Sequence, residues 1–516
     1  MPPNEQYQVA RDLIASSLGG FLPEIILSVA VCALFLHDLL TKGLNPRRSA
    51  AMAVVGLGLA GVALLFTWPE ASTQLFGWKT GDAHQGMLVQ DAFGWFFKML
   101  VVLSTLIVVP MCLQHPPFQN RRMGEFYALL LGSCLGMFLM AGASNLLMIY
   151  LGIEFASMGS YLLTAFVKGD RKGSEAGLKY VIYGSVASGV MLFGLSLVYG
   201  MTGSLYIGEI AQELLVGNIS QIGLITTGVL VFGGFAYKMA AFPMHFWCPD
   251  VYEGAPTPVT AWLSVASKAA GFAVFVRFLM SFSAGFNVDY RMTGGLLDSI
   301  GFGWRELVAV AATLSMTVGN MAALWQTNVK RMLAYSSVAH AGYLLMGVAV
   351  LDPSDTGGSQ FAPLIFYFMA YFVMNLGAFY IVNLVSAKEG REDLAGYRHL
   401  GRRAPVMAFC LTLFLFSLIG LPPTGGFIGK LQLIGAVIKS DMVWLAVVAG
   451  VNTAISVYYY ARLFKAMYLE DADETEPAPF VSAPGSLAFL GGFALLTLIL
   501  GVAFNPIAEL ARTFSF

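Results

Sequence analysis

Long apolar stretches recur along the whole chain, and they constrain its fold more than any other feature. Each has about 18 residues or more, which at 1.5 Å per residue is enough to cross a hydrocarbon core of about 30 Å. The chain is therefore predicted to be an all-α, polytopic membrane protein. We count fourteen spans, at residues 19–40, 50–68, 91–113, 124–141, 144–166, 176–201, 221–247, 257–281, 305–325, 329–351, 361–386, 405–438, 441–468 and 486–505.

The composition agrees with a membrane location. Of the 516 residues, 57% are hydrophobic and 11% are charged, whereas soluble proteins have about 25% charged residues. The formal net charge is −1, so no excess of basic residues indicates a nucleic-acid partner. The cysteines are too few and too scattered for a disulfide framework or for an iron–sulfur or zinc motif, since they are only Cys32, Cys112, Cys134, Cys248 and Cys410.

The loop charges give the expected orientation. Assigning the loops alternately to two sides places 17 Lys and Arg residues on one side and 6 on the other. Cytoplasmic loops hold most of the basic residues of a membrane protein. The asymmetry therefore predicts fourteen helices with both termini outside the cytoplasm. The first apolar run contains Pro23 and Glu24 and has no small-residue cleavage site, so we expect it to remain as the first helix.

Several charged residues remain inside the predicted spans. A charge at the bilayer centre costs about 2.5 to 3.5 kcal/mol on insertion scales, so such residues default to ion or proton pathways. Lys268 and Glu154 lie nearest the middle of their spans, and His340 is a histidine deep in a span that is suited to relay protons. The alternative for each is a hydrogen-bonded core residue. After the basic residues counted with the loops, five lysines remain inside the spans: Lys98, Lys179, Lys238, Lys268 and Lys430.

Charges nearer the ends of spans have a simpler interpretation. For Lys179, snorkelling of the side chain toward the cytoplasm explains the position about as well as function does. For Lys98 and Glu24, a structural role is favoured over a functional one. Arg277 also falls at a helix end, where it is expected to reach the headgroups.

Two spans are predicted to be interrupted. Pro243 breaks the seventh span beside Lys238, and the twelfth, at about 51 Å, is too long for one straight crossing. The twelfth contains "GLPPTGGFIGKL", with Pro422, Pro423, Gly425 and Gly426 just before Lys430. Paired broken helices are typical of inverted repeats in transporters. We expect N-terminal helices in 1–123, repeats of five helices in 124–281 and 305–468, and a last helix in 486–516.

Three segments carry a resemblance to a known family: "FPMHFWCPDVYEGAPTPVTAWLSVASK", "KRMLAYSSVAHAGYLLMG" and "GLPPTGGFIGKL". They resemble the antiporter-like membrane subunits of respiratory complex I, the NADH:quinone oxidoreductase. The similarity extends over essentially the whole chain. Within the family "PDVYEGAPTPV" and Lys430 are most similar to subunit N, because subunit M has glutamate at the latter position.

The resemblance implies a function and a set of site residues. Redox chemistry on partner subunits, which hold FMN, iron–sulfur clusters and quinone, would drive proton translocation here, with no cofactor or metal on this chain. Its partners would be K- and M-type membrane subunits and lipids, in a bacterial inner membrane. Glu154 and Lys238 would form an ion pair with Lys179 nearby, Lys268 would carry protons centrally, and His340 would connect it to the terminal Lys430.

Other functions remain open from the sequence. An Mrp-type cation/proton antiporter shares the ancestor, and a related hydrogenase- or ferredoxin-linked complex would use the same membrane subunit. A sodium site would need several oxygen ligands, whereas we expect the buried acids to be only Glu24 and Glu154. A passive membrane scaffold is a further alternative, although it would not need lysines beside two helix breaks.

Overall fold

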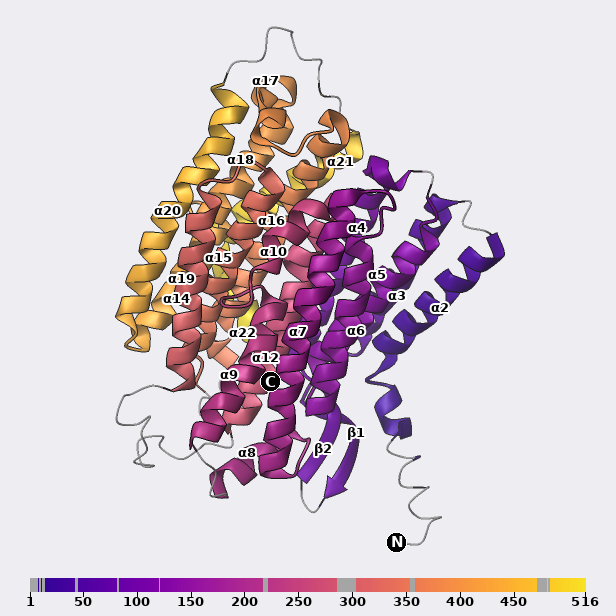
Figure 1. Cartoon of the computed structure of the whole chain (residues 1–516), viewed down its shortest axis with the longest axis vertical. Coiled ribbons are helices and arrows are strands. Elements are labelled where there is room, and N and C mark those ends of the chain that lie inside the picture. Colours follow the sequence, from indigo (N-terminus) through magenta and orange to yellow (C-terminus); the bar gives the residue numbers. More distant parts are fainter. Residues whose placement is uncertain are drawn as a thin grey trace.

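The structure is a computed structural model that describes residues 14–41, 45–80, 83–119, 121–216, 221–284, 303–352, 358–470 and 483–516, with Gln8, Arg11 and Phe480. Figure 1 shows a bundle of helices that run roughly along one axis, with α2 and α3 at one edge and α20 at the other. The segments 285–302, 471–479 and 481–482, between predicted spans, lie outside the described residues.

The first part of the chain contributes three long helices, a β-hairpin and the first predicted repeat. The elements are α2 (Leu22–Thr41), α3 (Pro46–Phe66), β1 (Thr73–Thr80), β2 (Ala83–Gln90), α4 (Ala92–Gln114), η1 (Pro116–Phe118), α5 (Gly124–Gly142), α6 (Leu146–Thr164), α7 (Arg171–Thr202), α8 (Ile207–Val216), α9 (Gln221–Met239), α10 (Trp247–Gly254), α11 (Thr257–Trp262), η2 (Leu263–Ser267) and α12 (Lys268–Ala284).

The second part contributes the second predicted repeat and the last helices. The elements are α14 (Trp304–Ala323), α15 (Val329–Ala349), η4 (Gly358–Gln360), α16 (Ala362–Glu389), η5 (Leu394–Tyr397), α17 (Leu400–Arg403), α18 (Pro405–Ile419), α19 (Gly425–Lys439), α20 (Val443–Tyr468), α21 (Pro484–Val502) and α22 (Phe504–Arg512).

The membrane prediction is confirmed. Within the described residues, thirteen helices are long and apolar enough to cross a bilayer. The twelfth predicted span, 405–438, is the remaining one, and it is occupied by α18 and α19, which have 15 residues each. Large apolar side chains of the edge helix α2 face outward, with Leu39 76% and Leu40 80% exposed. Such exposure on a helix of this length suits contact with lipid rather than with water.

The β-hairpin is a feature that the sequence analysis did not predict. Strands β1 and β2 pair antiparallel, with Thr73 opposite Gln90 and Leu75 opposite Leu88. They lie between the end of α3 and the start of α4, that is, between the second and third predicted spans. Figure 1 shows the hairpin at one end of the bundle and α17 at the other. We call these the hairpin end and the opposite end.

Both predicted helix breaks are present. The chain leaves helical geometry between α9 and α10, around Pro243, and again between α18 and α19, around Pro422 and Pro423. Groups freed by the first break find new partners, since Trp247 Nε1 donates to Tyr237 O and the Phe242 amide donates to Ser315 Oγ of α14. This matters because an unpaired backbone group inside a membrane costs several kcal/mol. The five-helix repeats themselves remain a prediction.

Candidate functional site

Four of the predicted site residues are buried inside the bundle. We call Lys238, Lys268, His340 and Lys430 the central row. All four side chains belong to residues that are at most 4% exposed. They come from four different elements, α9, α12, α15 and α19, so the packing of the bundle decides whether they meet.

Lys238 lies at the end of α9, directly before the first break. Its Nζ donates a hydrogen bond to Ser157 Oγ of α6 at 3.0 Å. Glu154 lies about one turn earlier on α6, and its buried Oε1 has no hydrogen-bond partner. Among the described residues no nitrogen–oxygen distance of 4.0 Å or less joins Lys238 to Glu154, so the expected ion pair is open in this conformation.

Lys268 follows a local change of helix type. A π-helical segment, Leu263–Ser267, directly precedes it, and such segments are frequent at functional sites. The Lys268 Nζ donates to both Ser337 O and Ser337 Oγ of α15, each at 2.6 Å. One turn further along α12, a Cβ at Gly271 would lie 3.2 Å from Lys238 Cγ. The side chain of Lys238 is therefore packed directly against the helix that carries Lys268.

One face of α15 joins the remaining members of the central row. Ser337, His340 and Tyr343 are spaced three residues apart, so they share a helix face. His340 Nδ1 shares a hydrogen bond of 2.6 Å with the Tyr367 hydroxyl of α16. The Lys430 Nζ lies 4.3 Å from the centre of the Tyr343 ring. This face of α15 thus contacts Lys268 at one end and Lys430 at the other, with His340 between them.

Lys430 is held by the second break. Its Nζ donates to Leu418 O at 3.0 Å and to Ile419 O at 2.9 Å, two carbonyls that the end of α18 leaves without helical partners. The two positions after Thr424 require glycine because other parts of the chain approach their backbone closely. A Cβ at Gly426 would overlap Ser417 O, and one at Gly425 would lie 2.6 Å from Leu500 Cβ. The break motif therefore positions the lysine as well as interrupting the helix.

Lys179 lies apart from the central row. Its side chain is 37% exposed, and its Nζ contacts Asp250 at 2.7 Å and Glu175 at 2.9 Å. These residues line a surface cleft of about 150 Å³ at the opposite end, together with Lys172, Glu253 and Arg331. Asp250 lies in α10, outside the spans. Burial raises its pKa, but the hydrogen bonds and charges of Lys179 and Arg331 outweigh burial and lower the pKa below its ordinary value.

The structure adds a residue that the sequence analysis did not name. His245, in the break between α9 and α10, is 3% exposed, and its Nδ1 has no hydrogen-bond partner. Its ring lies 5.8 Å from that of Phe242. The sequence could have indicated His245 as a candidate by its place between Pro243 and α10, because a histidine beside a proline break in a membrane helix is close to freed backbone groups.

Arg277 corrects an expectation. It does not reach the headgroups: it is 3% exposed and binds Asp91 through two hydrogen bonds, of 2.5 and 2.8 Å. It also donates to Ala141 O at 2.9 Å. The partner Asp91 is the N-cap of α4, nearly 190 positions away in the chain, so the sequence alone gave no signal for this pair.

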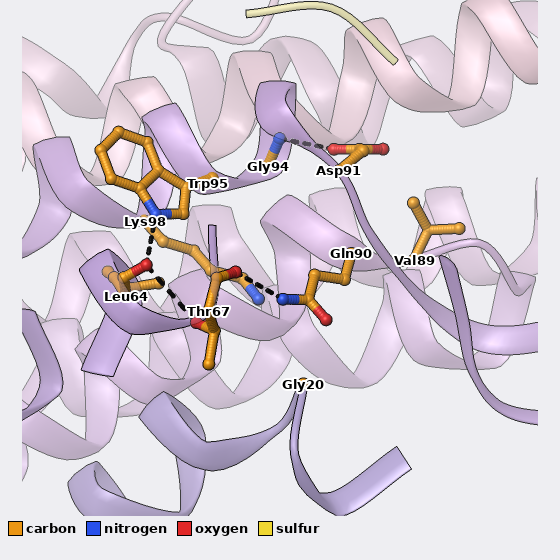
Figure 2. Close-up of a pocket in the computed structure, with 9 residues that line it drawn as sticks. All are labelled: Gly20, Leu64, Thr67, Val89, Gln90, Asp91, Gly94, Trp95 and Lys98. Atoms are coloured by element: carbon orange, nitrogen blue, oxygen red, sulfur yellow. Dashed lines mark hydrogen bonds between the residues drawn. The ribbon is translucent and has the colours of Figure 1, made fainter. Parts of the chain in front are cut away.

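Glu24 and Lys98 form a buried ion pair. The Lys98 Nζ lies 2.6 Å from Glu24 Oε1, with side-chain exposures of 8% and 1%. Figure 2 shows Lys98 among the residues that line a small pocket near the start of α4. This pair is separate from the central row.

Comparison with known proteins identifies the family. The family model described as "NADH:quinone oxidoreductase/Mrp antiporter, TM" matches residues 143–456. NADH-quinone oxidoreductase subunit N of Chlorobium chlorochromatii is 41% identical over 520 residues, covering 99% of this chain and 97% of its own length.

Solved structures agree with this match. A chain of respiratory complex I from Thermus thermophilus is 30% identical, with a TM-score of 0.75, over 94% of this chain and 98% of its own length. A chain of the Mrp complex from Dietzia sp. DQ12-45-1b shares the fold, with a TM-score of 0.79 at 19% identity over 96% of this chain and 97% of its own. The chain therefore belongs to the NADH:quinone oxidoreductase/Mrp antiporter family of membrane subunits, in which it is a homologue of subunit N.

Proposed function

We propose that this chain is the antiporter-like subunit N of a proton-translocating NADH:quinone oxidoreductase, and that protons cross it through the central row. One face of α15 carries His340 and also contacts Lys268 and Lys430, and this is the observation that carries the proposal. It places three titratable groups of different helices along about two turns of a single helix. Water and the hydroxyls of Ser337 and Tyr367 can bridge such separations.

Glu154 supplies the switch in this mechanism. Burial favours the neutral form of a lysine, whereas a nearby carboxylate favours the ammonium form. When Glu154 approaches Lys238, Lys238 holds its proton. When Glu154 moves away, as in the open arrangement described above, the proton can pass toward Lys268. A coupling of one pKa unit corresponds to about 1.36 kcal/mol, so a modest rearrangement suffices to load and release the row.

The energy comes from outside this chain. FMN, iron–sulfur clusters and quinone on partner subunits carry out the electron transfer, and K- and M-type membrane subunits lie next to this chain in the membrane arm. Names of the relatives support this assignment, since they are subunits of NADH-quinone oxidoreductase. The excess of basic residues in the loops at the opposite end supports an orientation with the hairpin end and both termini on the periplasmic side of the inner membrane.

Replacing Lys268 tests the proposal. Lys268→Ala in the intact complex, reconstituted in proteoliposomes, should abolish proton pumping through this subunit, because the member of the central row that lies between Lys238 and His340 is removed. The measurement is the ratio of protons moved to NADH oxidised. Lys439→Ala is the matched control, since Lys439 ends the helix of Lys430 but is exposed. Unchanged pumping by Lys268→Ala would reject the role and favour a passive scaffold.

An Mrp-type cation/proton antiporter is the second candidate. The shared fold with the Mrp complex of Dietzia sp. supports it. The two candidates differ in their coupling, because an antiporter moves protons in response to a cation gradient without redox partners. Imposing a sodium gradient on vesicles that contain the chain should leave the internal pH unchanged if our proposal is right. A pH change that requires sodium would favour the antiporter.

A further inference from the structure

The ammonium group of Lys430 has an aromatic ring among its contacts. Its Nζ donates to Leu418 O at 3.0 Å and to Ile419 O at 2.9 Å, and it lies 4.3 Å from the centre of the Tyr343 ring. An ammonium has three hydrogens to donate, so the two carbonyls leave one N–H without an oxygen acceptor. The face of an aromatic ring attracts a cation. The ring of Tyr343 therefore adds a third favourable contact to the charged lysine.

A bond to another helix holds the Tyr343 ring in place. The Tyr343 hydroxyl shares a hydrogen bond of 3.0 Å with Thr453 Oγ1 of α20, and it lies 3.5 Å from Ala449 O on the same helix. Tyr343 is 1% exposed. The helices α15, α19 and α20 pack against one another (Figure 1). The ring from α15 is thus fixed between the lysine of α19 and the threonine of α20.

The helices packed against α19 bring no carboxylate to Lys430. They are α15, α16, α18, α20 and α21. Neither α18 nor α21 contains a charged residue. The single carboxylate of these five described helices is Glu389, in the last turn of α16, where it pairs with Arg403. The basic residues of the same helices lie toward the opposite end: Lys330, Arg331, Lys388, Arg462 and Lys465.

Uncharged titratable side chains also lie on the helices around Lys430. They are His340 of α15, Tyr367 and Tyr371 of α16, and Tyr459 and Tyr460 of α20. Tyr367 packs on the residue before Lys430, since a Cβ at Gly429 would lie 2.7 Å from Tyr367 Cδ2, but its hydroxyl is bonded to His340. A tyrosine carries no negative charge at neutral pH. The charged lysine is therefore stabilised by neutral groups.

Lys430 differs in this respect from the other lysines of the central row. Lys238 is bonded to Ser157, and Glu154 lies about one turn away on the same helix. A carboxylate is thus close enough to act on Lys238 after a small movement. Among the described residues, Lys430 is the one member of the central row whose charge contacts an aromatic ring.

We propose that Tyr343 is a positioning residue for Lys430, and that its ring, held by Thr453, stabilises the charged form of the lysine in place of a carboxylate. The inference rests on the function proposed above, because it takes Lys430 to be a proton carrier. It assigns a role to α20, which contributes no member of the central row: Thr453 keeps the ring on the lysine.

The pH dependence of pumping tests the role of the ring. In Tyr343→Leu the ratio of protons moved to NADH oxidised, measured with the intact complex in proteoliposomes, should decline at a pH lower by about one unit. A desolvated cation–π contact favours the charged form by about that amount. Tyr343→Phe keeps the ring and should restore most of the shift. Tyr335→Leu is the matched control, because the Tyr335 ring on the same helix lies 5.9 Å from the Arg331 guanidinium instead; its pH profile should equal that of the parent.

A double-mutant cycle tests the part played by α20. Thr453→Val and Tyr343→Phe each remove the hydrogen bond between these two residues, so each should shift the profile in the same direction as Tyr343→Leu, but less. The double variant should shift it no further than one of them, because both changes remove the same bond. Additive shifts would show that Thr453 does not act through Tyr343. Thr453→Val also provides the pH test if Tyr343→Leu does not assemble.

An unchanged pH profile in Tyr343→Leu, or pumping reduced by the same factor at every pH, would overturn the proposal, since the ring would then only fill space. The outcome is separable from that of the proposed function. If Lys268→Ala abolishes pumping and the Tyr343→Leu profile is unchanged, this inference alone is wrong. Normal pumping by Lys268→Ala would reject both.

Discussion

The buried lysines of this protein fall into two groups according to the atoms that hold them. In the central row the acceptors are neutral oxygens: Ser157 Oγ for Lys238, Ser337 for Lys268, and main-chain carbonyls for Lys430. Lys98 instead binds the carboxylate of Glu24. A neutral acceptor can release a proton-carrying lysine without leaving a buried carboxylate unpaired, which is a large penalty in a medium of low dielectric constant. This difference suits the central row to repeated loading and release.

Gly271 gives a prediction at this scale. In Gly271→Ala the new Cβ would lie 3.2 Å from Lys238 Cγ and 3.3 Å from the Lys238 carbonyl carbon, which belongs to the backbone and cannot easily move. We expect Lys238 to lose its hydrogen bond to Ser157, which corresponds to about 1 kcal/mol and about a fivefold lower rate of proton transfer. The measurement is proton pumping in proteoliposomes. Gly228→Ala is the control on α9, because its Cβ meets open space; equal effects in both variants would contradict the prediction.

At the scale of elements, connections between distant helices depend on single polar residues at helix ends. His115 follows α4 and is 6% exposed. Its Nδ1 lies 3.2 Å from Asn383 Oδ1 of α16, and the Asn383 amide donates to Met111 O of α4. Because the amide nitrogen of Asn383 is occupied, its oxygen faces the histidine, so the Nδ1–H of His115 is the donor. This bond joins an N-terminal helix to the second predicted repeat.

The environment of His115 predicts a pH dependence. Burial, with a contribution from the charge of Lys330, lowers the pKa of His115 to about 4, against a partly opposing hydrogen bond to Asn383. In the unfolded chain a histidine binds a proton near pH 6.5. The unfolded state therefore binds more protons between these values, and stability falls as the pH falls from about 6.5 toward 4. At pH 5 the free energy of unfolding is lower by about 2 kcal/mol than at neutral pH.

His115→Gln tests this loss, since glutamine retains an amide donor and does not titrate. The melting temperature of the purified complex should fall less between pH 7 and pH 5 in the variant than in the parent. The rest of the complex has the same acid sensitivity in both, so the difference between the two drops isolates His115. Identical drops would show that His115 does not contribute.

At the scale of the whole molecule, ion pairs connect parts of the bundle that are distant in sequence. At the hairpin end Asp91 of the N-terminal helices binds Arg277 of the first predicted repeat. At the opposite end Arg331 of the second predicted repeat contacts Asp250 at 2.6 Å and Glu253 at 3.0 Å in the first. The two repeats are thus joined near one end by charges and along their middle by the contacts of the central row.

The Asp91–Arg277 pair gives a prediction for assembly. Arg277→Met should reduce the free energy of unfolding by about 3 to 5 kcal/mol, because it leaves a buried carboxylate without its partner. The double variant Asp91→Asn with Arg277→Met should recover most of this loss. The amount of subunit incorporated into the purified complex measures the effect. A double variant as poor as the single one would indicate that Arg277 acts through its packing on Phe93 and Phe516 instead.

The sequence by itself determined the membrane architecture, the two helix breaks and the presence of charged residues inside the spans. These follow from local properties: the length of apolar stretches, the missing amide of Pro243 and Pro422, and the cost of a charge such as Lys268 in lipid. Only the tertiary structure decided which residues meet. Lys238 donates its hydrogen bond to Ser157 and not to Glu154. Arg277 points inward and binds Asp91, and Lys98 forms an ion pair with Glu24. Partners separated by many tens of residues are chosen by helix packing, which no local pattern encodes.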